Sequence, residues 1–488
     1  MRLTDSRAGR WLLATASGGA ALLAFAPFDQ FWLAPLVCAA LFSLWCRAES
    51  VHETALSGLA FGLAFFLGGV SWIYVSLATF GGMPWWLAGP ATGLLCLFLA
   101  LFPAAAGLAF KRWQPLDGWR QALWFAALLA AVDWIRGWIF TGFPWLTLGY
   151  SQTPPSPLAG YAPLLGVFGL SLLLALTGAL LRQGRRGLIA LGIVLLLGQG
   201  LRLVPWTEAD GAPISVALVQ GNIPQEMKFR PEAFHRTLQT YYDLLAAHPA
   251  QLSLLPETAL PAFLDRLPAD YLSALADLAR RQQGDLVLGT ITGDVERYFN
   301  SAVSLGSAPQ QVYSKQHLVP FGEWIPAGFA WLMAFANIPM SSFTPGPTRQ
   351  PPMQVAGRAL AVNICYEDVF GEEIIRALPQ AGILANVSNT AWFGRSLAQP
   401  QHLQIARLRA LETGRPMLRA TNTGVTAIIN PQGEVVSQLP PFTRAVLQGE
   451  VTAQRGLTPY GRFGNTLALA LIALSGLLGL SGRQHRHS

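Results

Sequence analysis

Three residues that could carry out nucleophilic catalysis, Glu257, Lys315 and Cys365, each follow a short apolar run. Cys365 comes after Leu360–Ile364 and before a stretch with helical spacing, so we expect it on a tight turn between a buried strand and a helix. A thiol with a pKa of ~8.5 needs a cation or a base to become a good nucleophile. Lys315 would lower that pKa and hold an oxyanion, with the backbone N–H of Tyr366 as second donor. Glu257 would accept the thiol proton and later deprotonate the attacking group, for which it needs partial burial to raise its pKa.

Each of these residues also has a reading without catalysis. Cys365 could be a buried structural cysteine, Glu257 a solvated strand end and Lys315 a surface lysine. Cys365 is, however, the only cysteine in the polar part of the chain, so it has no disulfide partner there. The other three lie in long apolar runs, where they read as small core or lipid-facing residues: Cys38, Cys46 and Cys96. The catalytic interpretation is favoured because the three residue types occur together.

The segment around these residues alternates short apolar runs with stretches of helical spacing. Such alternation implies helices that cover both faces of sheets. The predicted strands are Ser215–Gln220, Leu252–Leu255, Leu286–Gly289, Ser301–Leu305, Gln311–Tyr313, Leu360–Ile364, Ile383–Val387, Leu418–Thr421 and Thr426–Ile429. The predicted helices are Pro231–Ala247, Asp270–Arg281, Val369–Leu378 and His402–Thr413, and the last two strands are expected to form a closing pair. The irregular stretch Gly322–Pro352 is long enough to be a functional lid.

The composition is that of a membrane protein over part of the chain. Hydrophobic residues make up 52% and charged residues 12% of the 488 residues. Residues 213–455 carry equal numbers of basic and acidic side chains, so the net charge of +7 belongs to the apolar remainder. There the basic residues stand at the ends of hydrophobic runs, which indicates membrane topology rather than binding of nucleic acid. Eight spans are predicted: Trp11–Ala26, Phe31–Cys46, Leu56–Val75, Trp86–Phe110, Ala122–Phe140, Leu164–Leu181, Gly187–Leu203 and Asn465–Leu480.

Lysine and arginine placement predicts how these spans are oriented. If eight spans alternate, one set of basic residues that flank the spans falls on a single side: Arg2, Arg7, Arg10, Arg47, Lys111, Arg112, Arg120, Arg182, Arg185, Arg186, Arg483 and Arg486. The opposite loops 27–30, 76–85 and 141–163 have no lysine or arginine. Both termini are then cytoplasmic and the segment between spans seven and eight is outside. The first span resembles a signal peptide, but Pro27 after the candidate cleavage site favours its retention.

Two charged residues inside one span and two aromatic stretches near the span ends each have two possible roles. Asp133 and Arg136 fall inside the fifth span, where charges are costly, and we favour a structural ion pair over a contact with a lipid head group. The stretches Gly142–Leu146 and Met83–Trp86 are aromatic and look like an interfacial belt, which is also how a lipid entrance would look.

Several motifs together resemble one family. The chain order Glu257, Lys315, Cys365 is similar to the Glu-Lys-Cys triad of the nitrilase, or carbon–nitrogen hydrolase, superfamily. A closer resemblance, over essentially the whole chain, is to the bacterial apolipoprotein N-acyltransferases. It is carried by Val219–Gln225, Pro256–Ala259, Lys315–Glu323, Ile364–Glu367, Ser388–Gly394, Arg419–Gly424 and Gly456–Tyr460. Thr390 departs from the pattern, since an acidic residue is expected there as often as not.

The resemblance implies a fold and a reaction. The fold is an α-helical membrane bundle of eight transmembrane helices plus an α/β nitrilase-like αββα sandwich. It divides into a bundle of seven spans (1–204), a periplasmic catalytic domain (213–455) and a C-terminal transmembrane helix (464–482). A glycerophospholipid would acylate Cys365, and the thioester would then acylate the α-amine of an S-diacylglyceryl cysteine of an apolipoprotein. Glu323 would orient Lys315, and Glu367 would lie beside the nucleophile; without the resemblance these read as a loop carboxylate and a helix N-terminal carboxylate.

The expected partners and two alternative functions follow. We expect no cofactor, no metal and no nucleic acid, a monomer in the bacterial inner membrane, and His317 and His402 as packing or surface residues. A membrane-anchored amidase or nitrilase would use the same triad with water as acceptor. A transporter or lipid-binding protein would use the bundle with an inactive outer domain, which the complete set of three residues argues against.

Overall fold

The computed structural model describes residues 6–115, 117–326 and 342–481. The chain divides into two compact units. One is formed by the residues up to Tyr74, by Trp86–Pro205 and by the residues from Arg462 onward. The other is formed by Trp206–Gly461 together with the short segment Val75–Trp85. The predicted domain 213–455 lies inside this second unit, which also recruits a segment from between two helices of the first.

The first unit is helical, and each predicted span coincides with one of its helices. These helices are α1 (Arg7–Ala21), α2 (Leu33–Arg47), α3 (Val51–Val70), α5 (Trp85–Arg112), α6 (Gly118–Arg136), α7 (Ala162–Leu180), α8 (Gly184–Leu201) and α14 (Thr466–Leu480). Within the described residues, four helical stretches have the length and apolar composition needed to cross a membrane: Val51–Val70, Trp85–Arg112, Pro157–Leu180 and Gly184–Leu201. The helices α2 and α14 are apolar but shorter. Each of the eight predicted spans therefore overlaps a helix in the described residues, and the crossing of a membrane by all eight stays a prediction.

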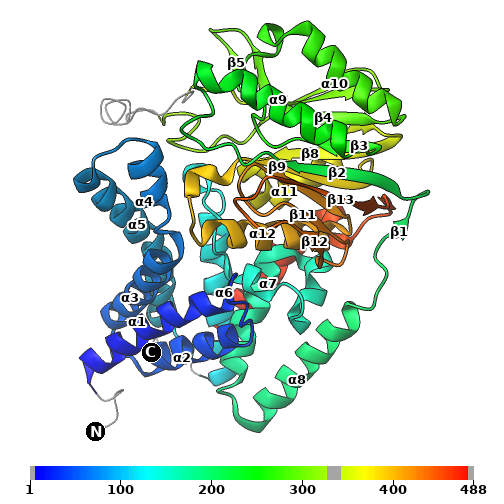
Figure 1. The fold of residues 1–488 in the computed structure, drawn as a ribbon. Coiled ribbons are helices and arrows are strands. Elements are labelled where there is room, and N and C mark those ends of the chain that lie inside the picture. The colour runs from blue at the N-terminus through cyan, green and yellow to red at the C-terminus, as the bar shows by residue number, and fades with distance from the viewer. Residues whose placement is uncertain (1–5, 116, 327–341, 482–488) are drawn as a thin grey trace. The chain divides into compact units, whose positions relative to one another are not determined.

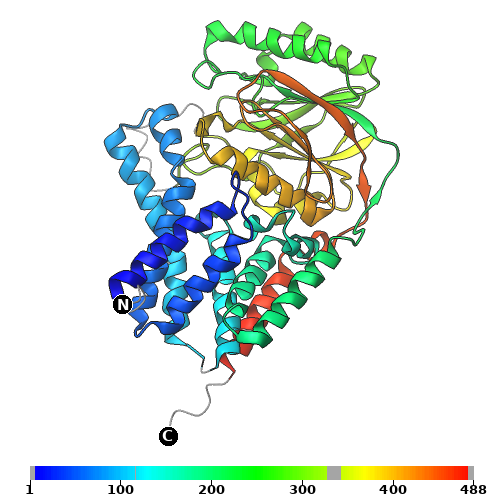
Figure 2. The ribbon, with the colours of Figure 1, turned by 60° about the horizontal axis from the view of Figure 1, so that its bottom comes forward.

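Local sequence explains where several of these helices begin and how closely they pack. Ser50 caps α3 by accepting from the Glu53 N–H at 3.2 Å, and Asp117 caps α6 by accepting from the Arg120 N–H at 2.8 Å. A Cβ at Gly58 of α3 would lie 2.3 Å from the Pro103 carbonyl oxygen of α5, so only glycine permits this approach. The last helix, α14, lies beside α6 and α7, although it is far from them in sequence (Figure 2).

The charged residues inside α6 form an ion pair, as predicted. Arg136 Nη2 lies 3.0 Å from Asp133 Oδ1, and Arg136 Nη1 donates to the carbonyl oxygens of Phe143 and Trp145 at 2.5 and 2.7 Å. The loop Gly142–Leu146 therefore folds over the guanidinium, and Trp145 is buried. The prediction of an interfacial belt is wrong for Trp145, because its side chain is buried. Its carbonyl oxygen accepts a hydrogen bond from the buried Arg136.

The second unit contains two six-stranded sheets (Figure 1). The first has the order β13-β2-β3-β4-β5-β6, with β13 Ala445–Val451, β2 Ile214–Gln220, β3 Leu252–Leu254, β4 Asp285–Gly293, β5 Tyr298–Gly306 and β6 Val312–Ser314. The second has the order β12-β11-β10-β9-β8-β7, with β12 Val435–Gln438, β11 Ala427–Ile429, β10 Met417–Thr421, β9 Ile383–Ser388, β8 Arg358–Ile364 and β7 Met353–Val355. The central strands β2, β3 and β4 are parallel, and so are β8, β9 and β10.

These sheets form the two inner layers of an αββα sandwich. A core that includes Val216, Leu254, Val362 and Leu418 joins the two sheets. On the outer face of the first sheet pack α9 (Pro231–Ala247) and α10 (Ala269–Arg281), and on that of the second packs α12 (Ala398–Thr413). The buried residues of α9, such as Leu238, Tyr241 and Leu245, recur at helical spacing, which explains why this helix lies flat on the sheet. The layering agrees with the resemblance.

Some sequence expectations need correction. The predicted helix Val369–Leu378 is broken into a 3-10 turn at Cys365–Val369, a short α11 at Gly371–Ile374 and a second 3-10 turn at Ile375–Ala377. The predicted closing strands become β10 and β11, but they do not close the domain. Three further strands follow in the described residues, β12, β13 and β14 (Gln454–Arg455), and β13 crosses to the first sheet to pair with β2.

The predicted lid Gly322–Pro352 lies partly outside the described residues, which exclude 327–341. Its described ends are tied to the domain, because the N–H groups of Phe343 and Gly346 donate to the carbonyl oxygens of Glu323 and Lys315 at 2.9 and 2.7 Å.

Candidate active site

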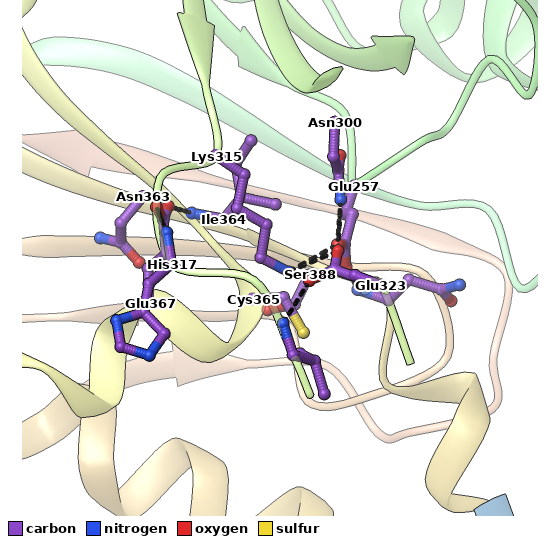
Figure 3. Close-up of polar contacts among 12 residues, drawn as sticks. Glu257, Asn300, Lys315, His317, Glu323, Asn363, Ile364, Cys365, Glu367 and Ser388 are labelled. Atoms are coloured by element: carbon purple, nitrogen blue, oxygen red, sulfur yellow. Dashed lines mark hydrogen bonds and ion pairs between the residues drawn. The ribbon is translucent and has the colours of Figure 1, made fainter. Parts of the chain in front are cut away.

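The three predicted catalytic residues converge at the ends of three strands. Glu257 follows β3, Lys315 follows β6 and Cys365 follows β8. All three are buried, with 7%, 1% and 8% of their surfaces exposed. Figure 3 shows the Cys365 thiol beside the Lys315 amine and the Glu257 carboxylate. The surface-lysine and solvated-strand-end readings of Lys315 and Glu257 are therefore wrong.

Lys315 is held between two carboxylates. Its Nζ lies 2.8 Å from Glu323 Oε1 and 3.4 Å from Glu257 Oε1. Glu323 is itself fixed, because its Oε2 accepts from the Val319 N–H at 2.8 Å. Burial works against the ammonium, but the two carboxylates outweigh it and raise the pKa of Lys315. The lysine is therefore a permanent cation, with two of its three hydrogens directed to carboxylates of described residues.

Glu257 is surrounded by hydrogen-bond donors from three other elements. Asn300 Nδ2 in β5 donates to Oε1 at 2.7 Å, and the Asn389 N–H after β9 donates to Oε2 at 2.8 Å. The buried Lys228 donates to the Glu257 backbone carbonyl at 3.1 Å. Asn300, Asn389 and Lys228 were not among the sequence candidates. Strand β5 also contains the buried polar residues Ser301 and Ser304, so the sequence of this strand does not single out Asn300.

The pKa of Glu257 moves in the opposite direction from the sequence expectation. Burial alone would raise it, but Lys315, Lys228 and the donors on Asn300 and Asn389 hold it below its ordinary value. Burial also lowers the pKa of the nearby Lys228, to about 8. Glu257 is therefore ionised in the resting protein.

Cys365 occupies a strained backbone position at the end of β8. Its φ is +52°, in the left-handed region that few residues other than glycine adopt. Burial and then the Glu257 charge raise the pKa of the Cys365 thiol, and Lys315 only partly opposes them. The expectation that Lys315 would give a low thiol pKa is therefore wrong, because burial of the thiol and the charge of Glu257 outweigh the effect of the lysine. In the resting protein the thiol keeps its proton.

Glu367 links the turn of the nucleophile to the segment that carries Lys315. Its carboxylate accepts from the Ile364 N–H at 2.6 Å, from the Gln316 N–H at 2.7 Å and from the His317 N–H at 3.2 Å. Tyr313 Oη donates to both of its oxygens at 3.0 Å. Burial raises the pKa of Glu367 to about 7, although the backbone donors oppose this. The contacts of this residue fix the spacing between Cys365 and Lys315.

A second buried network supports the nucleophile from β9 and β10. Asn386 Nδ2 donates to the Cys365 carbonyl oxygen at 3.1 Å, and Arg419 Nη1 donates to Asn386 Oδ1 at 2.8 Å. Arg419 also pairs with Asp368 at 3.1 Å, and His402 Nε2 lies 2.7 Å from the other oxygen of Asp368. His402 is therefore part of this buried network rather than a surface residue. His317, by contrast, stacks on Phe370 at 3.6 Å between ring centroids, as a packing residue would.

The loop after β9 has a partner from a distant part of the chain. Residues Thr390–Phe393 form a 3-10 turn directly after Asn389, the donor to Glu257. Ser76 Oγ donates to the Trp392 carbonyl oxygen at 2.8 Å, and the Phe80 ring meets the Trp392 ring edge-on at 6.1 Å between centroids. The segment Val75–Trp85 therefore packs on a loop that contacts the site.

The arrangement offers an ionised carboxylate, a fixed cation and a protonated thiol within one buried cluster, which suits attack on an acyl carbon. Within the residues that the structure describes, no group of three or more His, Cys, Asp and Glu residues could hold a metal ion.

Comparison with known proteins shows the family to which the chain belongs. A model of the apolipoprotein N-acyltransferase N-terminal domain matches residues 17–180, and a model of the carbon–nitrogen hydrolases matches residues 215–460. Among curated proteins, the apolipoprotein N-acyltransferase of Nitrosomonas europaea is 49% identical over 97% of this chain and 98% of its own length. That of Chromobacterium violaceum is 47% identical over 97% and 95%. Among solved structures, the CN-hydrolase superfamily protein XC1258 of Xanthomonas campestris, at 17% identity and a TM-score of 0.39, aligns over 57% of this chain and 100% of its own. With relatives this similar over nearly its whole length, the chain belongs to the apolipoprotein N-acyltransferase family.

Proposed function

We propose that this protein transfers an acyl chain from a glycerophospholipid to the α-amine of the S-diacylglyceryl cysteine at the N-terminus of an apolipoprotein. The observation that carries the proposal is the buried cluster in which Lys315 lies 3.4 Å from Glu257, beside Cys365. The relatives of this chain, which are apolipoprotein N-acyltransferases, supply the class of reaction.

The first half of the reaction forms a thioester. The Cys365 sulfur attacks the ester carbonyl carbon of the phospholipid while its proton passes to Glu257. Because the pKa of Glu257 is below and that of Cys365 above the ordinary value, this proton moves during the attack rather than before it. The bond from the carbonyl carbon to the glycerol oxygen then breaks, and that oxygen takes the proton from Glu257. The products are a lysophospholipid and acyl-Cys365.

The second half transfers the acyl chain to the amine. The neutral amine attacks the thioester carbonyl, the nitrogen loses a proton to Glu257, and the carbon–sulfur bond breaks. The sulfur regains the proton, and an amide is formed. An amine attacks a thioester more readily than an oxygen ester, which is the advantage of passing through cysteine.

In both halves a negative charge develops on the carbonyl oxygen. We assign its stabilisation to the remaining Lys315 hydrogen and to the backbone N–H of Tyr366, the residue after the nucleophile. Glu323 keeps the lysine in place through the 2.8 Å contact, and Glu367 keeps the turn of Cys365 in register with it. These roles account for each of the six predicted site residues.

The location follows from the same proposal. Both substrates carry lipid chains, so the α/β domain acts at a membrane surface, and the periplasmic side of the inner membrane agrees with the lysine and arginine distribution. We infer eight spans with both termini in the cytoplasm, and a monomer. A reporter fused after Trp206 should be active only if it works outside the cytoplasm, and one fused after Arg185 only if it works inside. The reverse pattern would contradict this topology.

The covalent intermediate provides the decisive experiment. The purified protein is mixed with a phosphatidylethanolamine and no acceptor, and the intact mass and released lysophospholipid are measured. We expect a gain of one acyl group on Cys365, removable by hydroxylamine, and one stoichiometric burst of lysophospholipid. Cys365→Ala should show neither, whereas Cys96→Ala should behave as the wild type. Continuous release of lysophospholipid and free fatty acid would favour the rival hydrolase with water as acceptor.

A further inference from the structure

One side chain contacts both carboxylates of the cluster and belongs to no part of the mechanism above. Asn300 lies in β5 with 2% of its surface exposed. Its Nδ2 donates to Glu257 Oε1 at 2.7 Å and to Glu323 Oε1 at 2.9 Å. These are the same two oxygens that Lys315 contacts. Each oxygen therefore receives one hydrogen from the lysine and one from the amide.

An amide suits this place for a physical reason. The two carboxylates contact the same lysine side chain, Lys315, and like charges at short range raise each other's pKa. The Asn300 nitrogen has two hydrogens, one for each carboxylate, and it adds no charge that would compete with Lys315. It can therefore stabilise both ionised carboxylates without neutralising the cluster.

The oxygen atom of the Asn300 amide lacks a hydrogen bond within the described part of the chain, and this reduces the stability of the fold. Asn300 Oδ1 is buried and has no hydrogen-bond partner among the residues that the structure describes. A buried carbonyl oxygen without a donor destabilises a fold. The amide orientation is thus determined by the two carboxylates, and such local violations are expected at functional sites.

The backbone of the same residue positions the lysine. The Lys315 N–H donates to the Asn300 carbonyl oxygen at 2.8 Å, next to the pairing of Ser301 with Ser314. One residue of β5 therefore aligns the start of the Lys315 segment through its main chain and both carboxylates through its side chain.

We propose that Asn300 is a positioning residue that keeps Glu257 ionised and in place as the proton acceptor for Cys365. The inference rests on the proposed function, since it concerns the rate of the acylation step. Through Glu257, the side chain of Asn300 determines the lowest pH at which the thiol can be acylated. When Glu257 carries the thiol proton, the bond from Asn300 to Glu323 keeps the second carboxylate on Lys315.

The test is the pH dependence of single-turnover acylation with a phosphatidylethanolamine, followed by the intact mass of the protein. Asn300→Ala removes a donor to the ionised form, so the pKa of Glu257 rises and the acid limb moves upward by about one pH unit. The rate of the variant should therefore fall up to about tenfold more than that of the wild type as the pH is lowered through the acid limb. Asn300→Asp keeps the side-chain volume but replaces the donor by a third carboxyl, and it should move the limb further.

A matched control lies on the same strand. Ser304 is buried in β5 and accepts from the Gln311 N–H at 2.9 Å, away from both carboxylates. Ser304→Ala should leave the acid limb where it is in the wild type. Because Asn300→Ala leaves a cavity, the isosteric Asn300→Asp variant decides the matter if the alanine variant does not fold.

Two results overturn the proposal. One is a loss of rate by the same factor at every pH in Asn300→Ala, and the other is a wild-type acid limb in Asn300→Asp. Either result with normal acylation of the wild type would remove only the role of Asn300. Absence of any acyl adduct in the wild type would instead refute the proposed function.

Discussion

Two buried charge clusters in this protein differ in their balance. In α6, Arg136 pairs with one carboxylate, Asp133, and it also contacts neutral groups: the carbonyl oxygens of Phe143 and Trp145, the Thr147 hydroxyl and the Phe66 ring. Asp133 in turn accepts from Ser171 Oγ at 2.8 Å and from the Leu148 N–H at 3.0 Å. That cluster holds one positive and one negative charge, and neutral groups satisfy the remaining atoms. Such an arrangement stabilises the fold and does not favour transfer of a proton between its groups.

The cluster in the α/β unit is unbalanced in its direct ion pairs, although the buried Lys228 also acts on Glu257 electrostatically. Lys315 pairs with two carboxylates, Glu257 and Glu323, and the thiol of Cys365 lies beside them. Burial and then the charge of Glu257 keep the proton on the thiol, while Lys315, Lys228 and the donors around Glu257 keep that carboxylate ionised. The comparison indicates that charge balance, rather than burial alone, separates a structural ion pair from a catalytic one.

The largest expected effect is on activity when the cation of the unbalanced cluster is removed. Lys315→Ala leaves two carboxylates facing each other and takes away a donor to the oxyanion, so acylation of Cys365 should fall by about 10³-fold or more. The rate of acyl-enzyme formation measures this, and a thermal melt checks the fold. Acylation near the wild-type rate in the purified variant would remove Lys315 from the mechanism.

Removal of the proton acceptor should have a similar or slightly smaller effect. Glu257→Gln preserves the shape but cannot take the thiol proton, so we expect a loss of about 10²–10⁴-fold in the acylation rate. Single-turnover measurements at neutral pH give this ratio. Retention of more than about a tenth of the rate would show that another group accepts the proton.

In the balanced cluster the effect should be on stability instead. Arg136→Met leaves Asp133 buried without its cation, which should cost about 3–5 kcal/mol of folding free energy. The double variant Asp133→Leu/Arg136→Met removes both charges and should be less destabilised than Arg136→Met alone. Melting temperatures in detergent measure both. The folded fraction should acylate Cys365 normally, and a selective loss of acylation would mean that this pair also serves the chemistry.

The smallest effect concerns the ionisation of the nucleophile. The Glu257 charge raises the pKa of Cys365, so Glu257→Gln should lower that pKa even though it abolishes catalysis. In proteins whose other cysteines are changed to alanine, the midpoint of alkylation by iodoacetamide should move to lower pH by about one unit. Because burial of the thiol is the same in both proteins, the comparison isolates the charge. A midpoint that stays in place would mean that Glu257 does not act on the thiol electrostatically.

The sequence predicts the site residues better than it predicts their electrostatics. Glu257, Lys315 and Cys365 stand at strand ends, and strand ends of packed sheets meet, so residue type and position were enough to select them. The direction of their pKa shifts depends on how many carboxylates and donors gather around each group. That is set by Asn300, Asn389 and Lys228, which approach from other strands and loops, and no local pattern indicates them.

The fold likewise has elements that local sequence predicts and contacts that it does not predict. Runs such as Ser215–Gln220 and Pro231–Ala247 are predicted from the sequence, because burial of apolar residues is a local requirement, and they appear as β2 and α9. The pairing of β13 with β2 joins residues more than 200 positions apart and has no local signature. The break after Val369 also escaped prediction, since the turn around Cys365 is held by the contacts of Glu367 rather than by helix propensity.

The packing of Ser76 and Phe80 on Trp392 bears on how such a protein could have arisen. An ancestral fusion that merely appended membrane helices to a finished enzyme would leave the enzyme's loops packed by its own residues. Here a segment from between α3 and α5 supplies packing for the loop whose Asn389 donates to Glu257. An exchange of residues 206–461 for the catalytic part of another hydrolase would therefore bring in a loop never selected to fit Ser76 and Phe80. The two parts are expected to have diverged together, with residues 75–85 as the place where changes in one had to be matched by changes in the other.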